Sequence, residues 1–293
     1  MISAATATFR AASSAHTSNT THTTGFFTLD KARELATLRH RDCRQRALRT
    51  SRHLTFSHTT LLELHGMTLR LTTRLNPHLL HVTVPHMKEK SHLVGVDEHL
   101  WTGPMSTQRL DELFSGVSVE QAVCQISQYT DVESLTMVMD WLTCANKDLR
   151  QSSHHKLREA IMSYGRFPGR RRCLTALSHS VEGTDSPQET LLRLALTNAG
   201  LPCPSVNHPI IDMVSQKEWK VDMAFEAHHV AIEYDGEYHY DHRRWTTDIH
   251  KRNRLQDLGW TVLVAVKGDL NSRNSLREFT MMVARALLDH SRR

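Results

Sequence analysis

The alternation of apolar and polar residues is clearest in the C-terminal third of the chain, across residues 220–235. Two runs, 220–225 and 230–235, alternate with a period of two, which is typical of a β-strand with one buried face. The four residues between them, 226–229, are few enough to join the strands as a hairpin. The sequence therefore predicts an antiparallel pair of strands here.

The two faces of each strand decide which residues of this hairpin meet, because successive side chains point to opposite faces. Strict alternation predicts that Lys220, Asp222 and Ala224 share one face of the first strand. On the second strand Glu233 shares a face with Asp235, and pairing brings Asp222 beside Glu233. Two carboxylates on neighbouring strands repel each other, so when partly buried they raise a pKa or bind a cation.

Further patterns on both sides of the hairpin extend it into an α/β region. Upstream, Ser186-Pro187-Gln188-Glu189 is typical of a helix start with serine as N-cap, and Gly200 ends that helix. The remaining elements are a strand at 207–213, a helix at 241–258, a buried strand at 260–266 and a helix at 271–288. The predicted order is helix, three strands, helix, strand, helix.

Each polar residue of this region also has an ordinary structural explanation. Glu189 can complete a capping box, and Asp222 can be an edge-strand charge that opposes aggregation. Glu233 can form a salt bridge to Lys220, Asp235-Gly236 can be a turn, and Asp248 and Arg252 can form a surface ion pair. The spacing of the whole set favours a shared site over these separate explanations.

The N-terminal half contains fewer regular patterns. A capped helix is predicted at 57–66, a strand at 79–84, and two more capped helices beginning at Ser118 and spanning 131–144. His58 and His65 lie seven residues apart on the first of these helices. A shared metal is one interpretation of the two histidines, and packing or capping is the favoured one.

Positive charge is concentrated before the hairpin region. The chain has 36 Lys+Arg and 31 Asp+Glu, a formal net charge of +5. Residues 186–293 contain equal numbers of basic and acidic residues, so the whole excess lies before them. One basic run occupies 31–52, which a solvated helical face also explains. A second cluster consists of Arg166, Arg170, Arg171 and Arg172, and such clusters attract nucleic-acid phosphates without regard to sequence.

The length of 293 residues indicates two domains. Residues 1–27 are rich in Ser, Thr and Ala and are expected to form a disordered leader, with domains at 28–183 and 184–293. No apolar run approaches the length of a membrane span, so no membrane partner is expected. The five cysteines lack Cys-x-x-Cys spacing, which makes zinc less favoured, and they fit a reducing, cytoplasmic location.

The combined motifs of the C-terminal region resemble a known family. They are Ser-Pro-x-Glu, an Asp in a strand, Glu-Tyr-Asp-Gly-x-x-His, and Asp-x-x-x-Arg-Asn-x-Leu-x-x-x-Gly-Trp. Together they resemble the nuclease-like domain of many actinobacterial proteins, which is related to very-short-patch repair endonucleases of the PD-(D/E)XK superfamily. The resemblance covers about residues 184–290. It implies a restriction-endonuclease-like αβββαβ core that hydrolyses DNA with Mg²⁺, or with Mn²⁺ in its place.

The resemblance also implies roles for particular residues. Asp222 and Glu233 match the two strand acids that hold the metal, and Glu189 matches the acid of the first helix. His239 falls where the repair-endonuclease relatives carry a histidine near the active centre.

One position departs from the superfamily pattern. Its Glu-x-Lys motif would have a lysine where this chain has Asp235. Asp248 and Arg252 match a polar pair on the following helix. The group that steadies the attacking water would then be Lys220, Lys251, Arg252 or His239.

Residues 28–183 resemble the abortive-infection antitoxin-like region that other proteins join to the same nuclease-like domain. The resemblance rests on Ser-His-x-x-x-x-x-x-His-Gly at 57–66 and on the arginine-rich turn at 166–172. It implies a basic, mixed α/β and mostly helical domain.

Three functional interpretations follow. The first is a metal-dependent DNA endonuclease, acting in DNA repair or defence, whose arginine cluster holds DNA while the acidic pocket cuts it. The second is a catalytically inactive DNA-binding or antitoxin-like regulator, which Asp235 at the lysine position favours. The third is a metal site that only stabilises the fold. Asp222, Glu233 and His239 together favour the enzyme.

Overall fold

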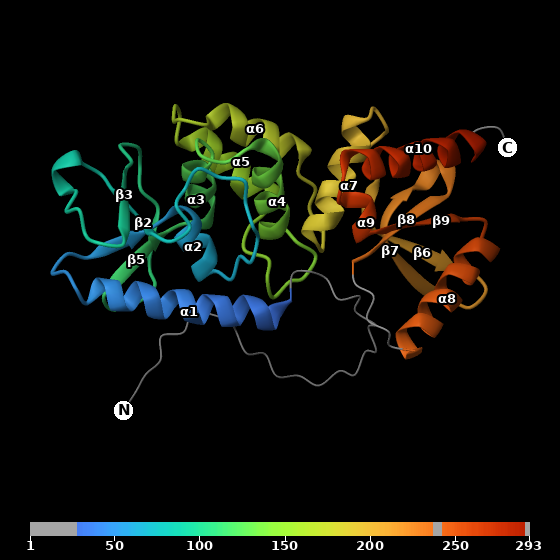
Figure 1. The fold of residues 1–293 in the computed structure, drawn as a ribbon, viewed down its shortest axis with the longest axis horizontal. Helices are drawn as coiled ribbons and strands as arrows, with labels where there is room; N and C mark the ends of the chain where they lie inside the picture. The colour runs from blue at the N-terminus through green and yellow to red at the C-terminus, as the bar shows by residue number, and fades with distance from the viewer. Residues whose placement is uncertain (1–27, 237–241, 291–293) are drawn as a thin grey trace. The chain divides into compact units, whose positions relative to one another are not determined.

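The chain forms two compact units, with the boundary between Glu182 and Gly183 (Figure 1). The computed structural model describes residues 28–236 and 242–290. The leader predicted for residues 1–27 lies outside the described residues. Both units combine helices with a mixed β-sheet, so the mixed α/β class predicted from the sequence is confirmed.

In its described residues the first unit contains six α-helices and a five-stranded sheet. The helices are α1 (Leu29–Ala47), α2 (His58–Leu64), α3 (Val119–Ile126), α4 (Val132–Leu142), α5 (His154–Ser163) and α6 (Arg170–His179), with a 3₁₀ turn η1 (Met87–Glu89). The strands are β1 (Leu54–Phe56), β2 (Leu80–Val84), β3 (Val96–Leu100), β4 (Thr107–Arg109) and β5 (Phe114–Val117). Their order is β3-β2-β1-β5-β4, and the β2–β3 and β1–β5 pairs are parallel.

Helix caps explain why the predicted helices of this unit begin where they do. Ser118 accepts a hydrogen bond from the Gln121 N–H at 3.2 Å, and Asp131 accepts one from the Ser134 N–H at 2.7 Å. Each bond satisfies a backbone donor that a helix start leaves free. The cap predicted from Ser57 is wrong, because its hydroxyl bonds the ring of the adjacent His58 instead, at 2.8 Å.

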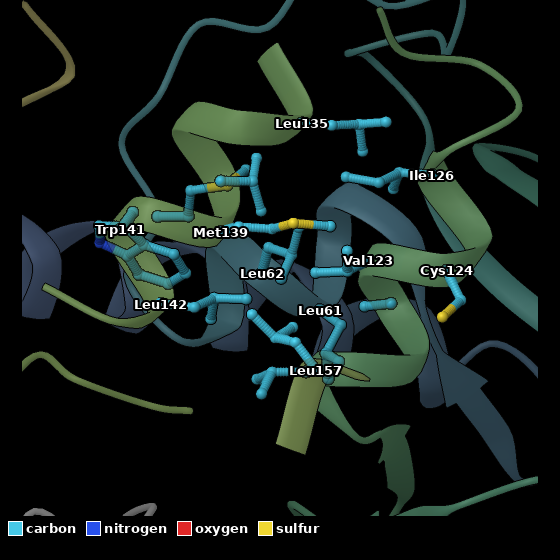
Figure 2. Close-up of a cluster of buried hydrophobic side chains, with 14 of the residues drawn as sticks. Leu61, Leu62, Val123, Cys124, Ile126, Leu135, Met139, Trp141, Leu142 and Leu157 are labelled. Atoms are coloured by element: carbon cyan, nitrogen blue, oxygen red, sulfur yellow. The ribbon is translucent and has the colours of Figure 1, made fainter. Parts of the chain in front are cut away.

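The core of the first unit lies between α2, α3, α4 and α5. Figure 2 shows the fully buried side chains that gather there, among them Leu62 from α2, Val123 from α3, Met139 from α4 and Leu157 from α5. Truncation of one such leucine to alanine typically costs about 2–5 kcal/mol. A second cluster, around Phe56 and Phe114, packs α1 against the sheet.

In its described residues the second unit has the predicted elements in the predicted order, with a short 3₁₀ turn and a short helix added. They are α7 (Pro187–Asn198), β6 (Ser205–Asp212), β7 (Lys217–Phe225), η2 (Glu226–His228), β8 (Val230–Asp235), α8 (His242–Asp257), β9 (Thr261–Val266), α9 (Lys267–Leu270) and α10 (Arg273–His290). The sheet order is β6-β7-β8-β9, with β8 and β9 parallel and the other pairs antiparallel.

Helices cover both faces of this second sheet (Figure 1). On one face, Leu192 of α7 and Val283 of α10 pack against Met223 and Ile232 of the two central strands. On the other face, Leu255 of α8 packs against alanine and valine side chains. The unit is therefore a helix, sheet, helix sandwich.

The alternation of faces along β7 changes phase at Asp222. Val221 and Ala224 belong to the cluster under α8, whereas Met223 faces α7 and α10. The expectation that Lys220, Asp222 and Ala224 share one face is therefore wrong. On the neighbouring strand β6, Asn207 has φ +50°, a left-handed conformation in the middle of the strand. The ladder pairs Val206 with Met223 and His208 with Val221, so the irregularity lies opposite Asp222.

Candidate functional site

Glu189 occupies the first turn of α7. Ser186 caps this helix by accepting a hydrogen bond from the Glu189 N–H at 3.2 Å. The Glu189 carboxylate in turn accepts one from the Asp185 N–H at 3.1 Å. Ser186 is therefore the N-cap, as predicted, whereas these bonds do not form the capping box expected of Glu189, because its carboxylate accepts from Asp185 and not from the cap residue. Glu189 is buried, so its carboxylate is removed from bulk water.

Asp222 lies at the point where the β7–β8 ladder ends. The register pairs Met223 with Ile232, and this is the last pair of the ladder before Asp222. The charge of Glu233 contributes to the raised pKa of Asp222, so the two acids lie near each other, while their direct pairing across the strands stays a prediction. One Asp222 oxygen accepts the backbone N–H of Tyr234 at 2.7 Å, which replaces the next ladder bond.

Glu233 of β8 meets two cationic side chains of α8. The ammonium group of Lys251 contacts its Oε1, and Nε of Arg252 lies 3.8 Å from its Oε2. The side chain of Glu233 is 12% exposed. The salt bridge expected between Glu233 and Lys220 as the ordinary explanation is wrong, because Lys220 Nζ lies 3.6 Å from an Asp185 oxygen instead.

Burial and mutual repulsion shift the pKa values of two of these acids. Burial, followed by repulsion from Asp222, raises the pKa of Glu189 to about 8. Burial also raises the pKa of Asp222 to about 6, against the hydrogen bond from Tyr234 and with a further contribution from Glu233. Glu189 therefore carries a proton at neutral pH. Asp222 therefore lies near both Glu189 and Glu233, although among the described residues the carboxylate oxygens of these three acids do not all lie within 4.8 Å of one another.

Three further residues of the predicted site are Asp235, His239 and Asp248. Asp235 is exposed at the end of β8, opposite Val266 of the parallel neighbour β9. His239 lies outside the described residues. Asp248 is exposed on α8, and its pKa is raised by desolvation and by the charge of Glu233.

The arginine cluster surrounds the start of α6 in the first unit. Gly169 precedes the helix with φ +88°, and a Cβ there would lie 2.2 Å from the Ser127 hydroxyl, so only glycine fits. Arg166, Arg171 and Arg172 are exposed, and Arg172 donates to the carbonyl of Gln128 at 2.9 Å. A pocket of about 530 Å³ is lined by Gln128, Phe167, Gly169, Arg170, Arg171, Arg172 and Thr175. Cations at a helix N-terminus oppose its dipole, so this surface is strongly electropositive.

Sequence reasoning missed a cluster on the edge of the first sheet. Within the described ranges, His81 of β2 and Asp97 and His99 of β3 form a group whose ligand atoms lie within 4.8 Å of one another. Asp97 and His99 are two residues apart, so they share one face of their strand. The two-residue spacing of Asp97 and His99 is the sequence feature that could have indicated this cluster. His65, by contrast, bonds Gln151 at 3.2 Å, which agrees with the packing interpretation of that residue.

Two more sequence expectations concern the whole chain. All five cysteines are free thiols, four of them buried. Over the part of the chain that the structure describes, no helix combines the length and the apolar character needed to cross a membrane.

The fold and the site define a mixed α/β protein whose second unit gathers acidic groups beside its two central strands. No known family model matches the chain, and no solved structure matches it significantly. Two uncharacterized proteins of Mycobacterium tuberculosis, from strains CDC 1551 / Oshkosh and H37Rv, are similar to part of it. Each is 32% identical over 87 residues, which is 29% of this chain. The matched part spans 32% of each relative.

Proposed function

We propose that the second unit hydrolyses phosphodiester bonds of DNA with the help of Mg²⁺, or Mn²⁺ in its place. The observation that carries this proposal is the position of Asp222 on β7, next to Glu189 at the start of α7 and to the adjacent strand β8, whose Tyr234 N–H it accepts at 2.7 Å and whose Glu233 contributes to its raised pKa. The element order α7, β6, β7, β8, α8, β9 agrees with the αβββαβ order of a restriction-endonuclease-like core. DNA repair or defence is the context that the resemblance implies.

The donor set fits a hard divalent cation. Mg²⁺ prefers oxygen ligands and is commonly held by one or two carboxylates together with substrate phosphates. Asp222 and Glu233 would hold it, and a bound cation would favour the ionised form of Asp222, whose pKa is raised by burial and, to a smaller extent, by the charge of Glu233. When bound, Mg²⁺ screens the charge that develops at phosphorus and lowers the pKa of a coordinated water.

The cations of α8 supply what the expected lysine at position 235 would. Lys251 contacts Glu233, so its ammonium group lies beside the carboxylate that would face the attacking water. Arg252 approaches the same carboxylate and is placed to contact a phosphate oxygen. Glu189, which retains its proton at neutral pH, can donate a hydrogen bond to a neighbouring oxygen.

A second candidate, from another class, is a DNA-binding regulator that does not cut. Lys251 and Arg252 already neutralise Glu233 without a metal, and Asp235 stands where a lysine is expected. In such a regulator the exposed arginines at the start of α6 bind the phosphate backbone, and the acidic group only stabilises the fold.

A plasmid-nicking assay with Mg²⁺ separates the two candidates. We expect the wild-type chain to convert supercoiled plasmid to open-circular or linear DNA, and Asp222→Ala to lose at least ~100-fold of that rate, as removal of one electrostatic catalytic group does. Glu218→Gln is the matched control, because Glu218 is an exposed acid on the same strand. DNA binding without Mg²⁺-dependent cutting by the wild type would contradict the enzyme and support the regulator.

A further inference from the structure

We propose that His81, Asp97 and His99 form a binding site for a divalent transition metal, Zn²⁺ first among them, in the first unit. The three residues belong to the parallel pair β2–β3, whose register places His81 beside Asp97 and Thr83 beside His99. Their side chains therefore project from one face of two adjacent strands. This site is independent of the acidic group in the second unit.

The separations of the ligand atoms match the edges of a metal coordination shell. Nδ1 of His81 lies 2.9 Å from Nε2 of His99, and the Asp97 carboxylate oxygen lies 3.5 Å from His99 Nε2 and 3.8 Å from His81 Nδ1. Ligands bonded tetrahedrally to Zn²⁺ at about 2.0–2.1 Å are ~3.3 Å apart. Movements of a few tenths of an ångström would therefore complete a three-ligand arrangement.

The other nitrogen of each imidazole has a partner that fixes its orientation. Nε2 of His81 lies 3.2 Å from the carbonyl oxygen of Asn76, which requires a hydrogen on that nitrogen and leaves a lone pair on Nδ1. Nδ1 of His99 lies 3.3 Å from the Tyr129 hydroxyl. Outer partners of this kind orient metal-ligating histidines and raise their basicity.

Packing holds the site rigid and leaves one side open. The ring of His58 stacks on that of His99 with the ring centroids 3.9 Å apart. His81 is 1% exposed and His99 10%, whereas Asp97 is 42% exposed. Three protein ligands with one exposed side leave a fourth position for water or an anion, as in zinc sites that act on substrates.

The chemical types of the three ligands determine which metal ions this site would bind best. Two imidazoles and one carboxylate suit Zn²⁺ and its first-row neighbours better than Mg²⁺, which prefers oxygen ligands. The competing explanation is a hydrogen bond between the two imidazoles with no metal, and it predicts no metal affinity.

Metal titration of the untagged full-length chain, stripped with a chelator, tests the proposal. We expect one equivalent of Co²⁺ to give the strong visible absorption of a tetrahedral site, and Zn²⁺ to displace it. Asp97→Asn and His99→Gln should each weaken binding by at least ~10-fold, and Tyr129→Phe by a similar factor through its effect on His99. Asp97 is exposed, so its variant should keep the fold, which circular dichroism would verify.

Two matched controls locate the metal. His78→Gln changes an exposed histidine close to the site, and Asp222→Asn changes the acidic group of the second unit. Both should keep the Co²⁺ spectrum. An unchanged affinity in Asp97→Asn and His99→Gln, loss of the spectrum only in Asp222→Asn, or absence of stoichiometric binding would each overturn the proposal.

Discussion

The protonation of Glu189 makes the free energy of unfolding of the second unit depend on pH. Its pKa is about 8 in the folded chain, against an ordinary value of 4.5. Between these values the folded state holds a proton that the unfolded state releases. The free energy of unfolding therefore decreases as the pH rises through this interval, and the stability is greatest at its acidic end.

We therefore expect Glu189→Gln to flatten the pH dependence of stability between about pH 5 and pH 8, because glutamine cannot lose a proton. Urea unfolding in the presence of chelator, followed by tryptophan fluorescence, measures this. Glu218→Gln should leave the slope unchanged. An unaltered slope in Glu189→Gln would mean that Glu189 is ionised in the folded chain.

Asp222, whose pKa is about 6, links the same acids to metal binding. A cation held by Asp222 must displace the proton of that residue, so lowering the pH from about 7 to about 5 should raise the Mg²⁺ concentration needed for half-maximal binding. The expected rise is up to ~10-fold per pH unit for each displaced proton. Calorimetric titration with Mg²⁺ at several pH values measures it, and a pH-independent affinity would place the cation elsewhere.

At the scale of elements, helix caps connect stability to the position of functional groups. Ser186→Ala removes the side-chain acceptor at the start of α7, which should cost about 1 kcal/mol of unfolding free energy. Because Glu189 lies in that first turn, the same substitution should also weaken Mg²⁺ binding. Asp131→Ala removes the cap of α4 and should cost a similar amount without affecting Mg²⁺. Equal Mg²⁺ affinity in both variants would mean that the cap of α7 does not affect the metal site.

Elements with strong local signals are those that the sequence predicts correctly. A cap followed by apolar residues places α3, α4 and α7, and alternation with a short connection places β7 and β8. The prediction that Asp222 lies beside Glu233 rests on that hairpin alone. Among the strands of the first unit, the sequence predicts only β2. Strands β1, β4 and β5 are three or four residues long, so their pairing partners define them and no local pattern does.

Features that depend on distant partners were missed for a physical reason. Asp97 and His99 meet His81 only through the parallel pairing of β2 and β3, which no local pattern specifies. The change of face at Asp222 accompanies the left-handed conformation of Asn207 on another strand. At Ser57 two hydrogen bonds compete: the hydroxyl bonds the ring of His58 and does not accept from a backbone N–H of the helix start.

For the whole molecule, the formal positive charge is concentrated in one part of the chain. Residues 186–293 are balanced in charge, so the formal excess of +5 belongs to the part of the chain before them. Some of these cations form ion pairs within the first unit. Nη1 of Arg44 donates to both carboxylate oxygens of Asp111 at 2.7 Å, and Nε of Arg39 lies 2.8 Å from a Glu63 oxygen. The exposed arginines before and within the first turn of α6 are the better candidates for binding a polyanion.

The salt dependence of DNA binding tests whether the arginines at the start of α6 hold the DNA. Each phosphate contact contributes about 0.9 to the slope of log affinity against log salt concentration, so the double variant Arg166→Ala, Arg171→Ala should weaken DNA binding at every sequence and lower that slope by up to ~1.8. The double variant Lys156→Ala, Arg158→Ala removes two exposed cations of α5 and serves as the matched control. If DNA is held by the arginines at α6, only the first variant changes the slope. If both variants change it equally, the attraction comes from the net charge of the molecule and not from a defined surface.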